Sequence, residues 1–388
     1  MRYLARTVLL AVCLTVLMPV SFAVAQEKHS VDLFEIKVNG KYGFIDQTGK
    51  VVIEPKFEGV YEFSEGLAVA NFRGKFFAGF INQSGKTIIE PQFDIASKFS
   101  EGLAWVGFDP TKTEYKIGGH TFYSGPASDS FNYNIGFIDK TGKFITEPIF
   151  SDARDFSEGL AVVKKRGDKK FGFIDRSGKY VLEPIYDGAS SFSEGLAAVF
   201  VKGKYGFIDK TGKFVVKPIF TDASDFSEGM ACVKIGGRIR KHNSGMQITT
   251  TGRDDRDFVY INKTGKVVFY IHADDCRPFQ EGLARIEVNG QWSFVDITGK
   301  ISLDHNTEVL SDFSEGLAMV LLADENVSFG FIDKAGNVVL RTNYALVDDF
   351  RGGLVKVTEY DPEHDRDVVY ERYGYIDRTG KVIWKPTR

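Results

Sequence analysis

The sequence predicts an all-β protein made of about nine small antiparallel units repeated in tandem, each with three strands. Two observations lead to this fold class. A phrase whose clearest copies read Gly-Phe-Ile-Asp, followed by Thr-Gly-Lys, recurs along the chain and marks the same position in every unit. No segment beyond the N-terminal region carries a sustained helical period. The copies of the phrase begin at Gly43, Gly79, Gly136, Gly172, Gly206, Val259, Ser293, Gly330 and Gly374.

The spacing of these copies sets the length of the repeating unit. Successive copies begin 34 to 37 residues apart, except for three longer intervals of 57, 53 and 44 residues. A regular period of this size is typical of architectures in which each unit buries its hydrophobic faces against its neighbours. The basic unit is therefore about 35 residues long, and three units carry insertions.

One unit, Glu194–Ser227, illustrates how the strands are predicted. β-Branched and aromatic residues fill three short runs, 196–201, 205–209 and 214–217, and turn-forming residues separate them. Pro218 ends the third run because proline cannot donate a backbone hydrogen bond to a neighbouring strand. Apolar residues on both faces of the strands indicate that each sheet lies between two others. The residues after the third strand either form a short fourth strand or only link the units.

Two ways of stacking the units are compatible with the sequence: a closed ring of blades and an open curved array. Open arrays usually end in polar capping segments, whereas this chain begins and ends with strands of the repeat and shows no such segment. Propellers typically have four to eight blades of four strands, and nine units with three clear strands depart from that range. On balance the sequence favours a propeller-like ring over an open superhelical stack.

The recurring carboxylates resemble a supply of catalytic groups. A catalytic acid–base pair occurs at one place in a chain, whereas these residues occur once in each unit. We therefore assign them to turns, where an Asp side chain bonds backbone N–H groups and a Glu marks the entry to the first strand. The aspartates are Asp46, Asp139, Asp175, Asp209, Asp296, Asp333 and Asp377, and the glutamates are Glu65, Glu101, Glu158, Glu194, Glu228, Glu281 and Glu315.

The N-terminus has the composition of a cleavable signal peptide. Arg2 and Arg6 precede an apolar run that ends in small residues at Ala23–Ala25. That run is shorter than the ~20 residues of a membrane span, so we expect no integral membrane segment after cleavage. The predicted organisation is a signal peptide at 1–25 and a repeat domain at 26–388, in the periplasm or outside the cell.

Charge and cysteine content narrow the function classes further. The formal net charge is −3, and it becomes −5 when Arg2 and Arg6 leave with the signal peptide. A mildly acidic chain lacks the positive surface that nucleic-acid binding requires, so we expect no nucleic-acid partner. Cys232 and Cys276 remain after cleavage, and an oxidising compartment permits a disulfide between them. The sequence leaves open whether they pair, because connectivity depends on geometry.

The consensus of the unit resembles that of the bacterial WG-containing repeat, also called the KWG repeat. The shared positions are Lys-Tyr-Gly-Phe-Ile-Asp, then Thr-Gly-Lys-x-Val-Ile-x-Pro, and then Phe-Ser-Glu-Gly-Leu-Ala, and they cover nearly the whole mature chain. Most units have Tyr or Phe where that family often has Trp, as at Tyr42 and Phe171; Trp292 keeps the Trp but is followed by Ser293. The resemblance implies an exported or surface-associated scaffold and brings no catalytic residues with it.

The three insertions are the places where we expect binding. They lie near 108–134, 236–257 and 359–372, each between the first and second strands of a unit, so they should emerge on one face of the stack. The alternative is that they are solvated loops without a ligand. Aromatic side chains of the first insertion and basic side chains of the second are the candidate binding residues: Tyr115, His120, Phe122, Tyr123, Tyr133, Arg238, Arg240 and Lys241.

Specific chemistry is not indicated elsewhere in the sequence. His364 lies among acidic residues, but their spacing matches neither a zinc site nor a calcium loop, and we expect no metal, no cofactor and no catalytic residue. The function predicted is a non-enzymatic scaffold that binds an envelope protein or a glycan. The alternative is a carbohydrate-active or other hydrolase on a ring of blades, which should show a deep pocket lined by carboxylates that the repeat does not explain.

Overall fold

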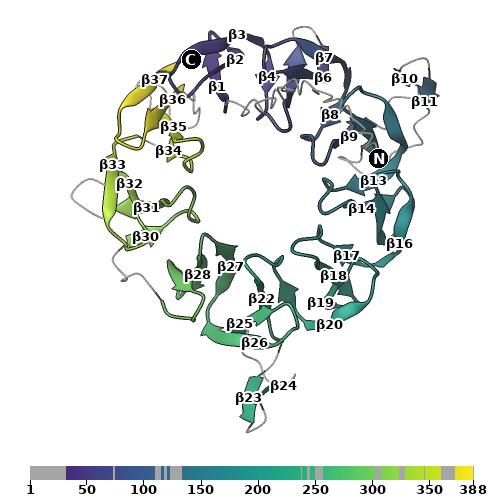
Figure 1. Cartoon of the computed structure of the whole chain (residues 1–388), viewed down its shortest axis with the longest axis vertical. Coiled ribbons are helices and arrows are strands. Elements are labelled where there is room, and N and C mark those ends of the chain that lie inside the picture. The colour runs from purple at the N-terminus through teal and green to yellow at the C-terminus, as the bar shows by residue number, and fades with distance from the viewer. Residues whose placement is uncertain are drawn as a thin grey trace, which may run out of the picture. The chain divides into compact units, whose positions relative to one another are not determined.

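The computed structural model confirms the all-β repeat architecture (Figure 1). It describes residues 32–72, 75–109, 115–117, 120–122, 133–236, 238–242, 245–249, 257–301, 307–322, 328–344, 346–359 and 372–387. These residues contain no helix, and hence none that is long and apolar enough to cross a membrane. All of the described residues belong to one compact unit, Asp32–Arg388.

The described strands form eight sheets and two separate hairpins. One seven-stranded sheet spans two repeat units, so the sheets give nine blades, numbered 1 to 9 in chain order. Blade 1 contains β1 (Phe34–Val38), β2 (Lys41–Ile45) and β3 (Val51–Phe57), and blade 2 contains β4 (Gly59–Val60), β5 (Leu67–Phe72), β6 (Lys75–Asn82) and β7 (Thr87–Phe93). Blade 3 contains β8 (Ile95–Ala96), β9 (Leu103–Phe108), β12 (Asn134–Asp139) and β13 (Phe144–Ala153), and blade 4 contains the end of β13 with β14 (Leu160–Lys165), β15 (Phe171–Asp175) and β16 (Tyr180–Tyr186). Blade 5 contains β17 (Gly188–Ala189), β18 (Ala197–Val201), β19 (Lys204–Ile208) and β20 (Phe214–Phe220). Blade 6 contains β21 (Asp222–Ala223), β22 (Met230–Lys234), β25 (Asp257–Asn262) and β26 (Val267–His272), and blade 7 contains β27 (Asp275–Gln280), β28 (Leu283–Val288) and β29 (Gln291–Asp296). Blade 8 contains β30 (Thr307–Val309), β31 (Ala318–Leu322), β32 (Ser328–Ile332) and β33 (Val338–Thr342). Blade 9 contains β34 (Leu346–Val347), β35 (Leu354–Glu359), β36 (Arg372–Asp377) and β37 (Val382–Thr387). The hairpins are β10 (Tyr115–Ile117) with β11 (His120–Phe122), and β23 (Arg238–His242) with β24 (Gly245–Thr249).

The question of a fourth strand is resolved in favour of a short strand that precedes the three expected ones. In blade 5, Gly188 and Ala189 of β17 pair with Phe200 and Val199 of β18. All neighbouring strands within a blade are antiparallel, as they are in β18, β19 and β20. The short strand arises because the chain turns back at the Phe-x-Glu-Gly phrase before it enters the longer strand.

Because neighbouring strands are antiparallel, the connections between them alternate between the two ends of each blade. The Phe-x-Glu-Gly turn and the Asp-x-Thr-Gly-Lys turn lie at one end, which we call the turn end. The connections between the two longest central strands lie at the opposite end, and the hairpins β10–β11 and β23–β24 belong to these connections. Figure 1 shows both hairpins outside the ring of blades.

The recurring aspartate has the local role that the sequence predicts. In blade 5, Oδ1 of Asp209 accepts hydrogen bonds from the N–H of Thr211 at 2.9 Å, its hydroxyl at 2.6 Å and the N–H of Lys213 at 3.1 Å. Gly212 takes a φ of +81° in this turn, a backbone region that glycine adopts without steric cost. In the same way, the Oδ1 atom accepts the backbone N–H two residues later at Asp46, Asn82, Asp139, Asp175, Asn262, Asp296 and Asp377.

The glycine of the Gly-Phe-Ile-Asp phrase is required by close backbone approach. A Cβ on Gly206 would lie 2.7 Å from both the Val216 oxygen and the Pro218 nitrogen of the neighbouring strand. We expect Gly206→Ala to lower the free energy of unfolding by about 1–3 kcal/mol, because the backbone of β20 would have to shift. Gly188→Ala in the same blade is the control, since its Cβ would meet only the Phe200 side chain at 3.4 Å. Urea denaturation of both variants tests this, and equal losses would contradict it.

The hydrophobic core lies between blades rather than inside any one of them. One cluster joins Phe173 of blade 4 to Phe192, Val199 and Ile208 of blade 5. The rings of Phe173 and Phe192 are 5.1 Å apart. A single three-stranded sheet could not bury both of its faces, and the stack of blades does so.

Blades 6 and 7 are also joined covalently. A disulfide links Cys232 in β22 to Cys276 in β27, with their Cα atoms 6.4 Å apart. Both side chains are buried. This resolves the pairing that the sequence left open.

The Phe-x-Glu-Gly turns connect each blade to the next one. Glu194 of blade 5 adopts a φ of +53°, and its carboxylate accepts the N–H of Gly229 in blade 6 at 2.9 Å and an ion pair from Lys263 at 3.0 Å. Ser193 donates its hydroxyl to the Phe226 carbonyl at 2.7 Å. The Glu-to-Gly contact recurs at Glu65, Glu101, Glu158, Glu228, Glu281 and Glu315.

The first and last blades contact each other, which confirms the propeller-like ring within Asp32–Arg388. A buried cluster combines Phe34, Ile36 and Ile45 of blade 1 with residues of blade 9, including Leu354 and Tyr375. The rings of Phe34 and Tyr375 are 5.4 Å apart, and β1 contacts both β36 and β37.

Candidate functional site

The repeat departs from its consensus where blade 9 meets blade 1. Blade 9 reads Arg351-Gly352-Gly353 at the turn where blades 2 to 6 and 8 read Ser-Glu-Gly and blade 7 reads Gln-Glu-Gly. Gly352 has no carboxylate to offer the next blade, and the positions of blade 1 that correspond to Phe, Ser and Glu lie outside the described residues. The hydrogen bonds that join neighbouring turns elsewhere are therefore not formed by the described residues at this junction, which we call the seam.

Charged side chains replace apolar ones in the strands that face each other across the seam. Glu35 in β1 and Lys356 in β35 occupy equivalent positions, and the Lys356 ammonium pairs with the Glu35 carboxylate at 2.8 Å. Lys356 also lies over the ring of Tyr373, 4.1 Å from its centre. The same position holds Val69, Trp105, Val162, Ala198, Cys232 and Met319 in blades 2 to 6 and 8, and Arg285 in blade 7.

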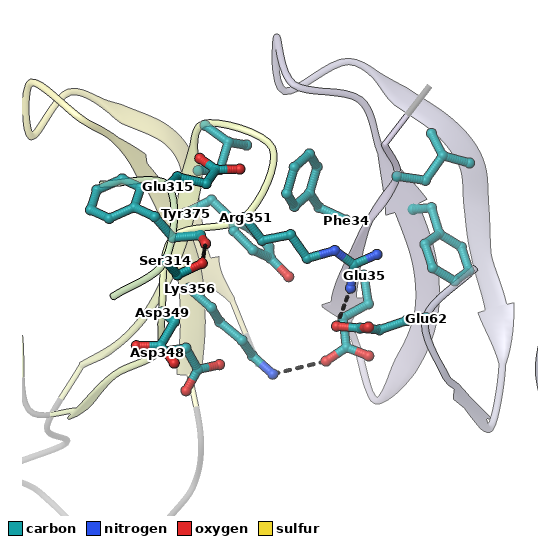
Figure 2. A pocket seen from close by; sticks show the side chains of 14 residues that line it. Phe34, Glu35, Glu62, Ser314, Glu315, Asp348, Asp349, Arg351, Lys356 and Tyr375 are labelled. Carbon is teal, nitrogen blue, oxygen red and sulfur yellow. Dashed lines mark hydrogen bonds and ion pairs between the residues drawn. The ribbon is translucent and has the colours of Figure 1, made fainter. Parts of the chain in front are cut away.

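Arg351 extends across the seam beyond the neighbouring blade. Its guanidinium forms an ion pair with Glu62, which lies just before the Phe-x-Glu-Gly turn of blade 2 (Figure 2). Glu62 is largely exposed, and exposed ion pairs contribute only about 0–1 kcal/mol. A ligand could therefore displace this contact at small cost.

A cavity of about 410 Å³ lies between the two blades at the seam. Its apolar wall includes Leu33, Phe34 and Leu354, and its polar groups come from both blades and from the adjoining turns (Figure 2). The volume falls within the ~300–1,000 Å³ that is usual for small-molecule sites. The charged and hydroxyl-bearing side chains that line it are Glu35, Glu62, Ser314, Glu315, Asp348, Asp349, Arg351, Lys356 and Tyr375.

Electrostatics in the cavity are set by carboxylates and a buried tyrosine. Burial, together with the charges of Glu35 and Asp348, raises the pKa of Tyr375 well above its ordinary value. Burial also acts to raise the pKa of Glu315, but Arg378 and the Gly353 N–H outweigh it and hold that pKa below its ordinary value. The phenol thus stays neutral and Glu315 stays ionised near neutral pH. Such a site is equipped to bind polar groups by hydrogen bonds and charge.

The residues proposed from the sequence lie on other parts of the molecule. Tyr115 is in β10, His120 and Phe122 are in β11, and Arg238, Arg240 and Lys241 are in β23. The two hairpins belong to different blades, 3 and 6, and to the end opposite the turns. Tyr133 is half-buried against a core cluster and accepts a hydrogen bond from Arg166 at its carbonyl, and Tyr123 lies outside the described residues. Whether these residues bind a partner stays a prediction.

Sequence reasoning does not identify the seam residues, because they are single substitutions in units of regular length, whereas the insertions change the length of the unit. A usable signal was present in the aligned repeats, where Glu35 and Lys356 stand at a mostly apolar position and Gly352 replaces the Glu of the turn. Among the described residues, no group of three or more His, Cys, Asp or Glu side chains is arranged to hold a metal ion.

Comparison with known families agrees with the repeat found in the structure. The family described as the WG containing repeat matches residues 42–76, 79–109, 135–169, 171–205, 205–238, 260–292, 292–324 and 329–361. These segments cover well over half of the chain. No curated protein matches the sequence.

Solved structures with a similar arrangement share little sequence with this chain. A crystal structure of the eukaryotic initiation factor is 10% identical and aligns over 92% of this chain and 97% of its own, with a TM-score of 0.54. Dihydro-heme d1 dehydrogenase NirN is 12% identical over 80% of this chain and 73% of its own (TM-score 0.44), and apo AztD from Citrobacter koseri is 14% identical over 81% and 92% (TM-score 0.37). The first likeness concerns the fold alone, and the other two are too weak to support an argument.

Proposed function

The chain belongs to the WG-containing repeat family, and on that basis we propose that it is an exported, non-enzymatic scaffold that binds a protein or a glycan of the bacterial cell envelope. The observation that carries this proposal is the seam cavity, because regular repeats would fill this space with apolar side chains and turn contacts. Here the chain instead places Glu35, Lys356 and Arg351 around an open volume. Residues that break a repeat and leave a polar cavity are better explained by binding than by stability.

Export is supported by the N-terminal composition and by the Cys232–Cys276 disulfide. Disulfides persist in oxidising compartments such as the periplasm and the cell exterior, and they are rare in the cytosol. The hairpins at the opposite end of the blades provide a second surface, on which Arg238, Arg240 and Lys241 would contact the same partner or another one.

A hydrolase is the second candidate, because carboxylates that the repeat does not explain line the cavity, as we expect of an enzyme. Glu35 and Glu62 are each held in an ion pair by a cation, Lys356 or Arg351. A general acid must instead carry a proton near neutral pH. The arrangement therefore favours binding, and we expect no product when the protein is incubated with envelope polysaccharides.

Binding to a glycan array and to envelope extract tests the proposed function. The seam variant is Glu35→Val with Lys356→Met, which removes both charges together and uses residues found at this position in blades 2 and 8. A second variant shortens the three insertions to tight turns. We expect the seam variant to bind its partner at least about tenfold more weakly while keeping its fold. Unchanged binding by the seam variant, with loss on shortening the insertions, would place the site on the hairpins and contradict the proposal.

A further inference from the structure

Tyr375 differs from the tyrosine at the same position in another blade. Tyr260 of blade 6 is fully buried, and its hydroxyl donates to the Arg277 carbonyl of blade 7 at 2.7 Å. Tyr375 of blade 9 is 5% exposed, and among the described residues its hydroxyl has no hydrogen-bond partner. The carbonyl that would correspond to Arg277 precedes Asp32 and is outside the described part of the chain.

The Tyr375 hydroxyl is directed into the seam cavity, near Arg351 and Glu35 (Figure 2). Its oxygen is not one of the fully buried side-chain atoms that lack a partner, so a ligand in the cavity can reach it. Other clear copies of the repeat have phenylalanine at this position, as at Phe173 and Phe207. The hydroxyl at Tyr375 is thus an addition to the repeat that packing does not require.

The charge of the cavity lining indicates which ligand it would accept. Five carboxylates line it against two cations, which leaves a formal charge of −3, and Arg378 outside the lining pairs with one of them, Glu315, and reduces this to −2. Both lining cations, Arg351 and Lys356, are already held by carboxylates. An anionic ligand would meet net repulsion, whereas a cation would meet acceptors and net attraction.

We propose that the seam cavity binds a protonated primary amine, with Tyr375 and Asp349 among the groups that accept its hydrogen bonds. An ammonium group has three donors and no acceptor, which matches a lining of carboxylate and phenol oxygens. Hydrogen bonds between ionised groups are the stronger class, and a partly enclosed site strengthens them further. The inference rests on the proposed binding function and specifies the chemistry of the ligand, which a lysine side chain or an amino sugar would supply.

Calorimetric titration with defined probes tests this inference. The probes are Nα-acetyl-lysine methylamide and glucosamine, each paired with its side-chain or amino-acetylated counterpart, at low ionic strength and slightly acidic to neutral pH. We expect at least one amine to bind about tenfold more tightly than its acetylated form. Tyr375→Phe should weaken that binding about fivefold, and Asp349→Asn should weaken it by a similar factor. Asp225→Asn, at the same turn position in blade 6, is the matched control and should leave binding unchanged.

The two amines distinguish the source of the ligand, since binding of the lysine probe alone indicates a protein and binding of glucosamine alone indicates a glycan. Equal binding of amine and acetylated probes, or no binding of either amine, overturns the inference. The outcome is separable from the proposed function. If the seam variant loses its envelope partner but no amine binds, the scaffold proposal stands and the ligand class is wrong.

Discussion

Reduction of the Cys232–Cys276 disulfide is expected to lower the free energy of unfolding by about 3–4 kcal/mol. The two cysteines are 44 residues apart in the chain, so the disulfide closes a long loop. Closing a loop of this length removes conformational freedom from the unfolded chain, which accounts for about 4 kcal/mol in the chain-entropy description. The disulfide joins β22 of blade 6 to β27 of blade 7, and its loss should therefore weaken the contact between these two blades.

Thermal or urea denaturation with and without reductant measures this effect. Cys232→Ala with Cys276→Ala is the control, because it should be less stable than the oxidised protein and insensitive to reductant. An oxidised protein whose unfolding midpoint does not move when both thiols are shown to be free would contradict the expectation. The ring should remain all-β in either state, since the cluster between blades 5 and 6 contains neither cysteine and the cluster between blades 6 and 7 keeps its other members, such as Tyr260 and Phe279.

Acidification below about pH 4 is expected to destabilise the ring sharply, because many native carboxylates have lowered pKa values. The hydroxyl of Thr211 lowers the pKa of Asp209. Burial acts to raise the pKa of Glu194, but Lys263 and the Gly229 N–H together outweigh it and lower that pKa. The pKa is also lowered at Asp46, Asp139, Asp175, Asp296, Asp333, Asp377, Glu65, Glu158 and Glu315.

The sign of the effect follows from linkage between protonation and folding. A carboxyl with a lower pKa in the folded protein contributes stability that is present above its unfolded pKa, near 4, and is lost as the pH falls through the folded value. Asp312 acts in the opposite direction, because burial raises its pKa despite the neighbouring Arg285. The melting temperature should therefore be nearly constant from pH 7 to 5 and should fall steeply below pH 4.

A variant with asparagine at Asp46, Asp175, Asp209 and Asp377 provides the comparison for this prediction. Asparagine already fills the position at Asn82 and Asn262, where its side-chain oxygen accepts the same turn hydrogen bonds. Because asparagine does not titrate, the variant should lose less of its melting temperature between pH 6 and 3 than the native protein does. Parallel losses in the two proteins would show that the turn aspartates do not cause the acid sensitivity.

Much of the fold could be predicted because the same turn and strand residues recur in every unit. Gly206, Asp209 and Gly212 recur with their neighbours at fixed spacing, so the hairpin turns and strands followed from turn chemistry alone. The short fourth strand, such as β17 (Gly188–Ala189), was harder to predict because two paired residues leave almost no periodic signal.

The role of the recurring glutamate could be predicted only in part. Glu194 was correctly assigned to a turn, but its bond to Gly229 joins two blades, and a single unit contains no information about which neighbour it meets. Pairing of Cys232 with Cys276 depended in the same way on how adjacent blades stack.

The seam could not be located from the sequence without the ring. Glu35 and Lys356 are 321 residues apart, and their contact exists only because the last blade packs against the first. Their departure from an apolar position is visible in the aligned repeats, yet it gains meaning only when closure brings the two together. The insertions are visible in one sequence because they lengthen a unit, whereas the cavity results from single substitutions at repeated positions.

The claim that the seam is an open site is tested most directly by comparing two tyrosine-to-phenylalanine variants in urea denaturation. Tyr260→Phe should lower the free energy of unfolding by about 1–2 kcal/mol, because the Arg277 carbonyl loses a buried donor. Tyr375→Phe should leave it within about 0.5 kcal/mol of the native value or raise it, because its hydroxyl has no partner among the described residues. A loss at Tyr375 as large as that at Tyr260 would mean that the hydroxyl is already bonded within the protein and that the seam is closed to a ligand.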